Sequence, residues 1–195
     1  GLTVVRPAYS FGRPFVLDFF SRAGGPNLIA RLRAGRPLIV PGEGNEPMHV
    51  SAAWNTGRMI AAIATSPAAE GKSYTCAHRE AIDRDGYYRL FARAAGVEPV
   101  LVHVPTELLL PLEGKLIPDN LLSELCRFPL AFSTEAFRRD FPDFRWERSL
   151  EEGAADYVRH RDEAGPPWPA AADDWQDAVA AAWTAARGSF AEVLG

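Results

Sequence analysis

Apolar residues recur along this chain at two spacings, one typical of strands and one typical of helices. The first apolar run, Leu2 to Val5, is rich in β-branched residues and ends at Arg6-Pro7, so it predicts a strand. The apolar residues between Asn27 and Ala34 have helical spacing, and Gly35 ends the predicted helix. A second strand is predicted from Pro37 to Val40.

A glycine-rich turn at residues 42–45 follows this strand and leads into another apolar run from Met48 to Val50. We expect the two strands and the turn to form a hairpin-like excursion. Ser51 is then in position to cap a helix that runs to about Thr65. The apolar side of that predicted helix consists of Trp54, Met59, Ile60 and Ile63.

The middle of the chain continues the alternation of strands and helices. Lys72 to Ala77 and Glu98 to Val104 predict strands. The amphipathic segment between them, Asp83 to Ala95, predicts a helix that stops at Gly96. This order is typical of an α/β fold rather than of a helical bundle or an all-β sandwich.

The carboxy-terminal third contains clearer signals for helices than for strands. Phe128 to Phe132 predicts a short strand, and Ser133 predicts a cap for the helix that follows. Ser149 and Glu152 match a capping box, in which each side chain satisfies a backbone donor of the other, so a helix is predicted from Leu150 to about Arg161.

A tail begins at residue 165. Residues 165–169 are rich in proline and predict a stiff linker. The final predicted helix runs roughly from Asp174 to Leu194, and it must bury one apolar stripe against this chain or another. The residues of this stripe are Trp175, Val179, Ala182, Trp183, Ala186 and Phe190. We therefore divide the chain into residues 1–164 and a tail, residues 165–195.

Composition excludes several classes of protein. With 47% hydrophobic and 24% charged residues, the chain can bury a sizeable core. A formal net charge of −4 and a pI of about 5.6 argue against a nucleic-acid-binding domain, which usually has a basic face. Cys76 and Cys126 are far apart, which favours buried thiols over a disulfide or a zinc site. The apolar runs are too short to span a bilayer, so we expect a cytoplasmic protein.

No complete catalytic or metal-binding motif is present in the sequence. Residues 42–47 come nearest to a dinucleotide-binding fingerprint, but Pro47 stands where the third glycine would be, and a strand follows instead of a helix. A tight turn is the better interpretation. His49 borders this turn and is the best ligand-contact candidate among the four histidines.

Several stretches, in this order, resemble one family: the extended short-chain dehydrogenases/reductases of the NAD-dependent epimerase/dehydratase group. Residues 3–12 (Thr-Val-Val-Arg-Pro-Ala-Tyr-Ser-Phe-Gly) resemble a late Rossmann strand of the family and the Arg-Pro loop after it. Residues 32–44 resemble the helix, strand and glycine turn that line the substrate pocket. Residues 49–50 with the helix behind them, 71–96 and 132–153 resemble the segments in which the family returns to its sheet and closes.

The resemblance implies an α/β fold made of the last strands of a Rossmann-type sheet and a small substrate-binding α/β domain, without the N-terminal dinucleotide-binding half. NAD or NADP would bind only together with that half. By position, Pro7 and Ala8 would contact the cofactor. The residues implied for the substrate pocket are Tyr9, Phe11, Arg13, Asn27 and His49.

The sequence departs from the family pattern in two ways that affect function. The family transfers protons with a Tyr-x-x-x-Lys pair, and neither Lys72 nor Lys115 has a tyrosine four residues before it, so no catalytic residue is expected in this chain. Members that act on nucleotide sugars usually carry an arginine after the glycine turn to bind the diphosphate. Residues 45–48 contain none and add Glu46.

Three functions stay open at this point. The first is the substrate-binding part of an NAD(P)-dependent epimerase, dehydratase or reductase for a small hydroxyl- or carbonyl-bearing, sugar-like substrate; it predicts an exposed apolar sheet edge at residues 2–6. The second is a non-catalytic module that binds a small molecule or RNA. The third is an interaction subunit that forms a homodimer through its terminal helix. The basic surface for the second would be Arg31, Arg33 and Arg36, or Arg138, Arg139, Arg145 and Arg148.

Overall fold

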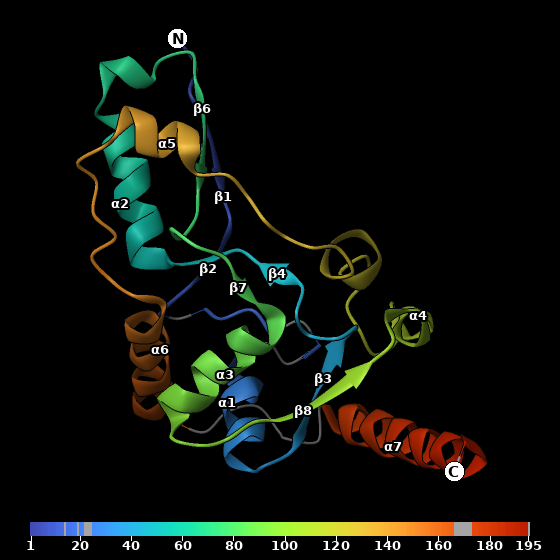
Figure 1. The fold of residues 1–195 in the computed structure, drawn as a ribbon. Helices are drawn as coiled ribbons and strands as arrows, with labels where there is room; N and C mark the ends of the chain where they lie inside the picture. Colours follow the sequence, from blue (N-terminus) through green and yellow to red (C-terminus); the bar gives the residue numbers. More distant parts are fainter. Residues whose placement is uncertain (14, 19, 22–24, 166–172, 195) are drawn as a thin grey trace.

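The computed structural model describes residues 1–195 except for residues 14, 19, 22–24, 166–172 and 195, so most of the predicted linker lies outside the described residues. Strands and helices alternate along the chain (Figure 1). Their order is β1 (Val4–Pro7), β2 (Tyr9–Phe11), α1 (Gly25–Arg33), β3 (Pro37–Pro41), β4 (Pro47–Met48), β5 (Val50–Ala52), α2 (Ala53–Ala64), β6 (Ser73–Cys76), β7 (Ile82–Asp83), α3 (Arg84–Ala95), β8 (Val100–Val104), α4 (Thr106–Leu109), α5 (Glu135–Asp140), α6 (Leu150–Ala164) and α7 (Asp174–Leu194).

The described strands associate as four two-stranded pairs. The pairs β1–β6, β2–β5 and β3–β8 are parallel, and β4–β7 is antiparallel. Parallel partners need a crossover connection, and each of these pairs joins strands that a helix separates in the sequence. The predicted α/β class is confirmed.

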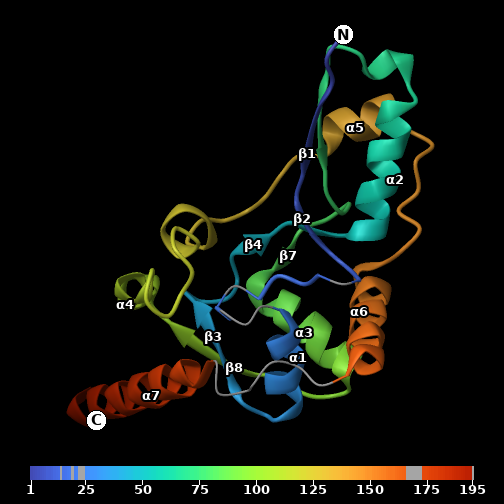
Figure 2. The same cartoon turned by 180° about the vertical axis from the view of Figure 1, so that it is seen from behind.

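Two hydrophobic cores hold these elements together. The larger core includes Phe11, Phe91 and Tyr157 and joins α1, α3 and α6 to the strands around them. The smaller core includes Tyr74 and Phe137 and lies where α2 and α5 cover one face of the β1–β6 pair. Figures 1 and 2 show these two groups at opposite ends of the molecule, with β2 between them.

The two cysteines lie in these cores, as the sequence predicts. Cys76 and Cys126 are free and buried. Burial raises the pKa of the Cys76 thiol to about 11 and that of Cys126 to about 12, so both stay protonated at neutral pH. No helix among the described residues combines the length and the apolar character that crossing a membrane requires.

Local capping explains where two of the helices begin and end. The Asp83 side chain accepts a hydrogen bond from the Gly86 backbone at 2.5 Å at the start of α3, and Gly96 ends this helix in the left-handed conformation with φ of 73°. Both bonds of the Ser149–Glu152 capping box are present at the start of α6. The predicted stop at Gly96 and the predicted capping box are confirmed, while Asp83, expected as the first helical residue, is the N-cap.

The predicted hairpin over residues 37–50 is wrong. β3 pairs with β8 and β4 pairs with β7, while His49 separates β4 from β5. The local pattern gave the strands, but their partners come from distant segments. The predicted strand over residues 128–132 is also absent from the structure, where Leu130 forms only an isolated bridge with Met48.

Two predicted caps are shifted by one residue. Ser51 lies in β5, its hydroxyl donates to the Ala52 carbonyl at 3.2 Å, and Ala52 is the N-cap of α2 without a side-chain bond. Thr134, not Ser133, is the N-cap of α5. Ser133 still accepts a hydrogen bond from the Glu135 backbone at 3.2 Å, so its hydroxyl supports the same helix end.

The apolar side of α2 is narrower than the sequence predicts. Met59 and Ile63 are buried against the β1–β6 pair, but Trp54 is 52% exposed and Ile60 is 38% exposed. Only one side of this helix faces the sheet, and the remaining apolar side chains face outward.

Arg31 holds the start of the tail helix against the body. Its side chain is fully buried, and its guanidinium donates to the carbonyls of Pro37 at 2.6 Å and Asp173 at 3.1 Å and to Asp177 Oδ1 at 3.0 Å. Three acceptors around one cation satisfy most of its donors, which is the condition for burying an arginine.

The tail helix covers the outer edge of β3 and then extends away from the body (Figures 1 and 2). Gln176 Oε1 accepts a hydrogen bond from the Ile39 backbone N–H at 3.1 Å, on the side of β3 away from β8. The predicted stripe is therefore covered only in part. Trp175, Val179 and Trp183 pack against the larger core, whereas Phe190 is 68% exposed.

Candidate functional site

An open groove of about 570 Å³ runs along the β1–β6 pair, from Ser73 at the start of β6 to Pro7 and Ala8 at the carboxyl end of β1. Side chains alternate across a strand, so Arg6 and its register neighbour Thr75 face away from the small core that buries Tyr74. Ligands of open α/β sheets bind at the carboxyl ends of the parallel strands. The lining residues are Arg6, Pro7, Ala8, Ser73, Thr75, Ala131, Phe132, Ser133 and Ala136.

The groove combines one cation, several hydroxyls and an apolar wall. Arg6 Nη2 donates to Ser73 Oγ at 2.6 Å, and no carboxylate among the described residues pairs with this guanidinium. Thr75 and Ser133 add hydroxyls, while Pro7 and Phe132 are exposed apolar rings. A few polar groups on an apolar wall are typical of sites for small molecules.

His49 lies behind this groove and holds Phe132, one of its walls, in place. Its ring is 4% exposed and stacks on Phe132 with a centroid distance of 6.1 Å. Nε2 lies 2.7 Å from the His78 carbonyl oxygen, and Nδ1 accepts a hydrogen bond from the Phe132 backbone at 3.1 Å. A carbonyl only accepts and a backbone N–H only donates, so Nε2 is the donor and Nδ1 the acceptor in this arrangement. Both ring nitrogens therefore bind backbone groups of the protein itself.

Tyr9 follows the groove residues in β2, beside Val50 of β5. Burial, and then the nearby Cys126, raises the pKa of its hydroxyl to about 12. At neutral pH this hydroxyl is protonated, so it is suited to hydrogen bonding rather than to proton abstraction.

The other sequence-predicted pocket residues lie elsewhere. Phe11 is 2% exposed and packs edge-on against Phe91 at 5.2 Å, inside the larger core. Arg13 forms an ion pair with Glu163 at 2.8 Å and borders a separate shallow hollow of about 340 Å³. Asn27 is fully buried in α1. The structure thus brings Pro7 and Ala8 into one groove with His49 behind it, and contact of the rest with a substrate stays a prediction.

A buried polar cluster surrounds Asn27. Asn27 Nδ2 and the Ser21 hydroxyl both donate to Asp173 Oδ2, and this carboxylate is fully buried. Burial, and then the charge of Asp173, raises the pKa of nearby Asp18 to about 7. This cluster ties the segment before α1 to the start of the tail.

The glycine turn after β3 is a tight turn, as the sequence indicates. Gly42 and Gly44 have φ of 72° and 78°, which favour glycine. A Cβ on Gly44 would lie 2.2 Å from Asp85 Oδ1 and 2.6 Å from His103 Nε2, so the turn packs directly on these side chains. The Asp85 and His103 side chains therefore fill the space beside Gly44, where a ligand would otherwise lie.

Arg84 lies beside this turn, and its guanidinium already has several acceptors. Its side chain is 5% exposed and donates to the Pro41 carbonyl at 2.6 Å and to the Cys126 carbonyl, with Glu46 Oε2 at 3.5 Å. An arginine saturated by carbonyls and a carboxylate is a poor diphosphate ligand.

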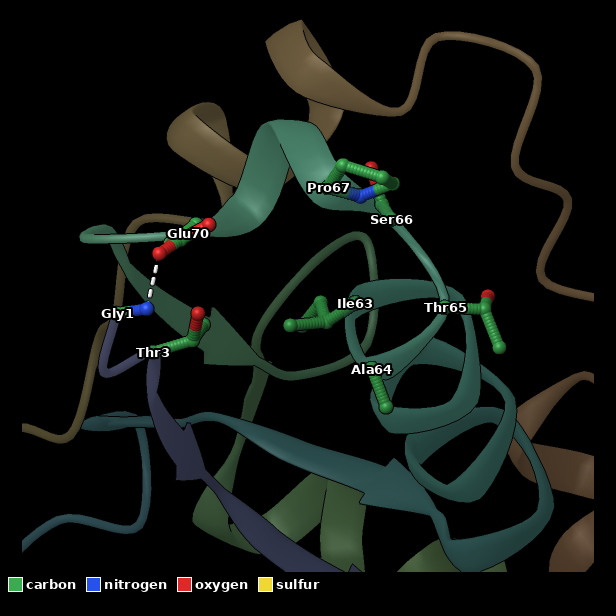
Figure 3. A pocket seen from close by; sticks show the side chains of 8 residues that line it. All are labelled: Gly1, Thr3, Ile63, Ala64, Thr65, Ser66, Pro67 and Glu70. Atoms are coloured by element: carbon green, nitrogen blue, oxygen red, sulfur yellow. Dashed lines mark hydrogen bonds and ion pairs between the residues drawn. The ribbon is translucent and has the colours of Figure 1, made fainter.

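A second hollow, of about 450 Å³, lies at the opposite, amino-terminal end of β1 (Figure 3). Its wall includes Thr3, Ile63 and Pro67, and an ion pair between the Gly1 amino group and Glu70 crosses one side. It lies away from the carboxyl ends of the strands, so the groove beside Pro7 is the better candidate.

The sequence pattern could have pointed to part of the groove. Lys72 to Ala77 alternates polar and apolar residues, which signals one open face on that strand. It did not reveal that Arg6 would lie beside Thr75 or that Phe132 would close the groove, because both contacts join distant segments.

The sequence matches no protein-family model and no curated protein. The structure resembles solved enzymes. Against an epimerase, Mth375, from Methanothermobacter thermautotrophicus the TM-score is 0.60 with 16% identity, over 83% of this chain and 43% of that one. Against UDP-glucuronic acid 4-epimerase from Bacillus cereus, in complex with UDP-glucuronic acid and NAD, the TM-score is 0.57 with 11% identity, over 84% of this chain and 46% of that one.

A dTDP-glucose 4,6-dehydratase from Bacillus anthracis, solved in complex with NAD, gives a TM-score of 0.56 with 13% identity, over 82% of this chain and 44% of that one. The chain shares its fold with part of these enzymes. It spans less than half the length of each of the three structures. At this identity the likeness shows the fold, and activity and substrate are matters for proposal.

Proposed function

We propose that this chain is the substrate-binding part of an NAD(P)-dependent epimerase, dehydratase or reductase that acts on a small hydroxyl- or carbonyl-bearing, sugar-like substrate. The observation that carries the proposal is the groove along the β1–β6 pair, which reaches the carboxyl end of β1 at Pro7 and Ala8, in a fold shared with such enzymes. The dinucleotide-binding part would come from a longer form of this chain or from a second chain.

The open edge of β1 supports this arrangement. Within the described residues β1 pairs with β6 alone, and the apolar side chains of Leu2, just before β1, and of Val4, its first residue, are 79% and 43% exposed. The apolar edge that the first hypothesis predicts at residues 2–6 is present. An unpaired parallel edge is a template for one more strand, which the dinucleotide-binding part would add.

The groove residues fit one side of a nicotinamide cofactor. Pro7 and Ala8 would form an apolar wall beside the nicotinamide ring, which accepts or donates hydride when the cofactor is bound. No glycine-rich loop before a helix is found in the described part of the chain to hold a pyrophosphate, so that contact falls to the dinucleotide-binding part.

The polar groups of the groove favour a substrate rich in hydroxyls over a diphosphate. Arg6 is the single cation among its lining residues, and the hydroxyls of Ser73, Thr75 and Ser133 accept and donate. Arg84, beside the glycine turn, already binds two carbonyls and lies 3.5 Å from Glu46, so it offers little to a further anion.

Calorimetric titration of NAD(H) and NADP(H) onto the protein isolated with its native partners tests this proposal. We expect binding of one dinucleotide, weakened about tenfold or more by Thr75→Trp, which fills the groove, because a misplaced ligand loses its polar contacts. Ala185→Trp, on the exposed side of α7, is the matched control. A wild-type protein that binds neither dinucleotide contradicts the proposal.

The far end of α7 favours a second role, that of an interaction subunit. Phe190 and Val193 are 68% and 83% exposed, and their spacing of three residues places them side by side on one face of the helix, where a partner chain would bury them together. Phe190→Glu with Val193→Lys should then lower the oligomeric mass in light scattering. An unchanged mass would count against a homodimer through this helix.

A further inference from the structure

A larger groove borders the site beside Pro7 and shares Phe132 and Ser133 with it. It has a volume of about 1320 Å³ and runs between the end of β6, α5, the extended segment 141–149 and the start of α6. We name it the arginine groove. Its charged and aromatic lining consists of Arg79, Arg138, Arg139, Arg145, Arg148, Glu135, Glu147, Glu152, Phe132, Phe141, Phe144 and Trp146.

The glutamates of the arginine groove are mostly engaged. Glu147 pairs with Arg58, outside the groove. Glu152 accepts the Ser149 backbone N–H at 2.8 Å in the capping box of α6. Of the three glutamates that line the groove, only Glu135 has no described side-chain partner.

The arginines keep an excess of positive charge. Arg139 pairs with Asp140, and Arg148 pairs with Asp156. Arg79 and Arg138 are exposed and have no carboxylate partner among the described residues. Arg145 donates to the Pro142 and Phe144 carbonyls, each at 3.2 Å, and no carboxylate in the described part of the chain pairs with it.

The floor between these arginines is aromatic and fixed. Phe144 and Trp146 pack edge-on at 5.2 Å, and Trp146 Nε1 donates to the Ala77 carbonyl at 3.1 Å. Both rings are half-buried, so each keeps one surface open to the groove. Burial lowers the pKa of His78, the remaining titratable group of this wall, so it adds no charge at neutral pH.

We propose that the arginine groove binds an acidic peptide segment of a partner protein, with carboxylates on Arg79, Arg138 and Arg145 and apolar side chains on the aromatic floor. Its volume exceeds the range of about 300 to 1,000 Å³ that is typical of small-molecule pockets. Arginine and aromatic side chains together are the residues that dominate protein interfaces.

The charge of the chain favours a peptide over RNA. A nucleic acid presents one phosphate per nucleotide, which needs a continuous basic track. This chain has a net charge of −4, and Glu135 and Glu147 interrupt the arginines of the groove. A peptide with a few carboxylates matches this mixed surface better.

Fluorescence anisotropy at low salt tests the proposal with three labelled probes: a short peptide of alternating glutamate and phenylalanine, the same peptide with lysine in place of glutamate, and oligouridine. We expect the glutamate peptide to bind most tightly. Arg79→Gln with Arg138→Gln should weaken it about tenfold or more, because two charge-assisted contacts are lost.

Arg93→Gln with Arg187→Gln removes two other exposed arginines and is the matched control, expected to change the affinity by less than about twofold. Equal binding of the glutamate and lysine peptides, equal loss in both double variants, or tighter binding of oligouridine would overturn the proposal. Because neither double variant touches the groove beside Pro7, the result is independent of dinucleotide binding.

Discussion

The pairs β1–β6 and β3–β8 have the same architecture but differ in whether the outer edge of the pair is covered. Both are parallel pairs of short strands with a helix against them. The outer edge of β3 is covered by α7, where Gln176 accepts the Ile39 N–H. The outer edge of β1 has no described partner, and Leu2 and Val4 stand exposed beside it.

This difference indicates which edge is complete within the chain. Proteins usually cover or charge the edges of their sheets, because an open edge pairs with other chains. The edge of β3 is covered through buried polar contacts, and the edge of β1 carries apolar side chains instead. We therefore expect mutations at the first edge to affect stability and mutations at the second to affect association.

The largest effect is expected from Arg31→Ala, which breaks the covered edge. The substitution removes a fully buried side chain and leaves the Pro37 and Asp173 carbonyls without their donor, while Asp177 keeps its ion pair with Arg36, and it should lower the free energy of unfolding by about 3 to 5 kcal/mol. Arg33→Ala removes an exposed ion pair with Asp162 and should cost less than about 1 kcal/mol. Urea denaturation measures both, and equal losses would refute the role of Arg31.

A pH-dependent effect is expected at the polar cluster beside the same edge. Burial raises the pKa of Asp18 from 3.8 to about 7, so the folded state holds a proton that the unfolded state has released. Stability should therefore fall as the pH rises from about 4 to 7, by up to roughly 4 kcal/mol.

Asp18→Asn should remove this loss, so that the variant is more stable than the wild type at pH 8 and the difference shrinks towards pH 5. Urea denaturation at both pH values gives the comparison. Asp143→Asn, at an exposed carboxylate, is the control and should leave the profile unchanged. A wild-type free energy of unfolding that does not fall between pH 5 and 8 would contradict the raised pKa of Asp18.

Gln176→Ala sharpens the comparison at a single bond. It leaves the Ile39 N–H without its acceptor and should cost about 1 to 3 kcal/mol, with faster hydrogen exchange at that amide. Thr184→Ala, which removes a hydroxyl bonded to its own helix, should cost less than about 0.5 kcal/mol. Unchanged exchange at Ile39 would show that α7 does not protect the strand.

The smallest effect on stability is expected at the open edge. Leu2→Glu with Val4→Lys should change the free energy of unfolding by less than about 0.5 kcal/mol, because both side chains are already exposed. In sedimentation experiments the double variant should nevertheless self-associate less than the wild type. Trp54→Glu, an exposed apolar residue away from this edge, is the control; equal self-association of the wild type and the double variant would argue against an adhesive edge.

The sequence predicted local structure well where one segment carries its own signal. The Ser149–Glu152 box and the Gly96 stop are complete within a few residues, and both are present in the structure. Pairing of strands was not predictable in this way. The β3–β8 pair joins residues about sixty apart, and no local pattern distinguishes it from the expected hairpin.

The sequence predicted which backbone segment borders the candidate site but not which side chains would line it. Pro7 ends β1 and Ala8 follows it, and both this strand and the alternation of residues 72–77 that pair with it are visible in the sequence. Asn27 and Phe11 were named for the same pocket, but helix α1 and the packing of Phe91 bury them elsewhere. Burial of this kind depends on tertiary contacts that a single segment does not encode.

Native mass spectrometry of the protein isolated from its own cells tests the central claim most directly, because one spectrum reports the polypeptide mass, any partner chain and any bound dinucleotide. We predict a mass above the 21.3 kDa of these residues, from a longer chain or a second one, together with NAD or NADP. A single 21.3 kDa species that carries no dinucleotide and gains none on titration would contradict the account.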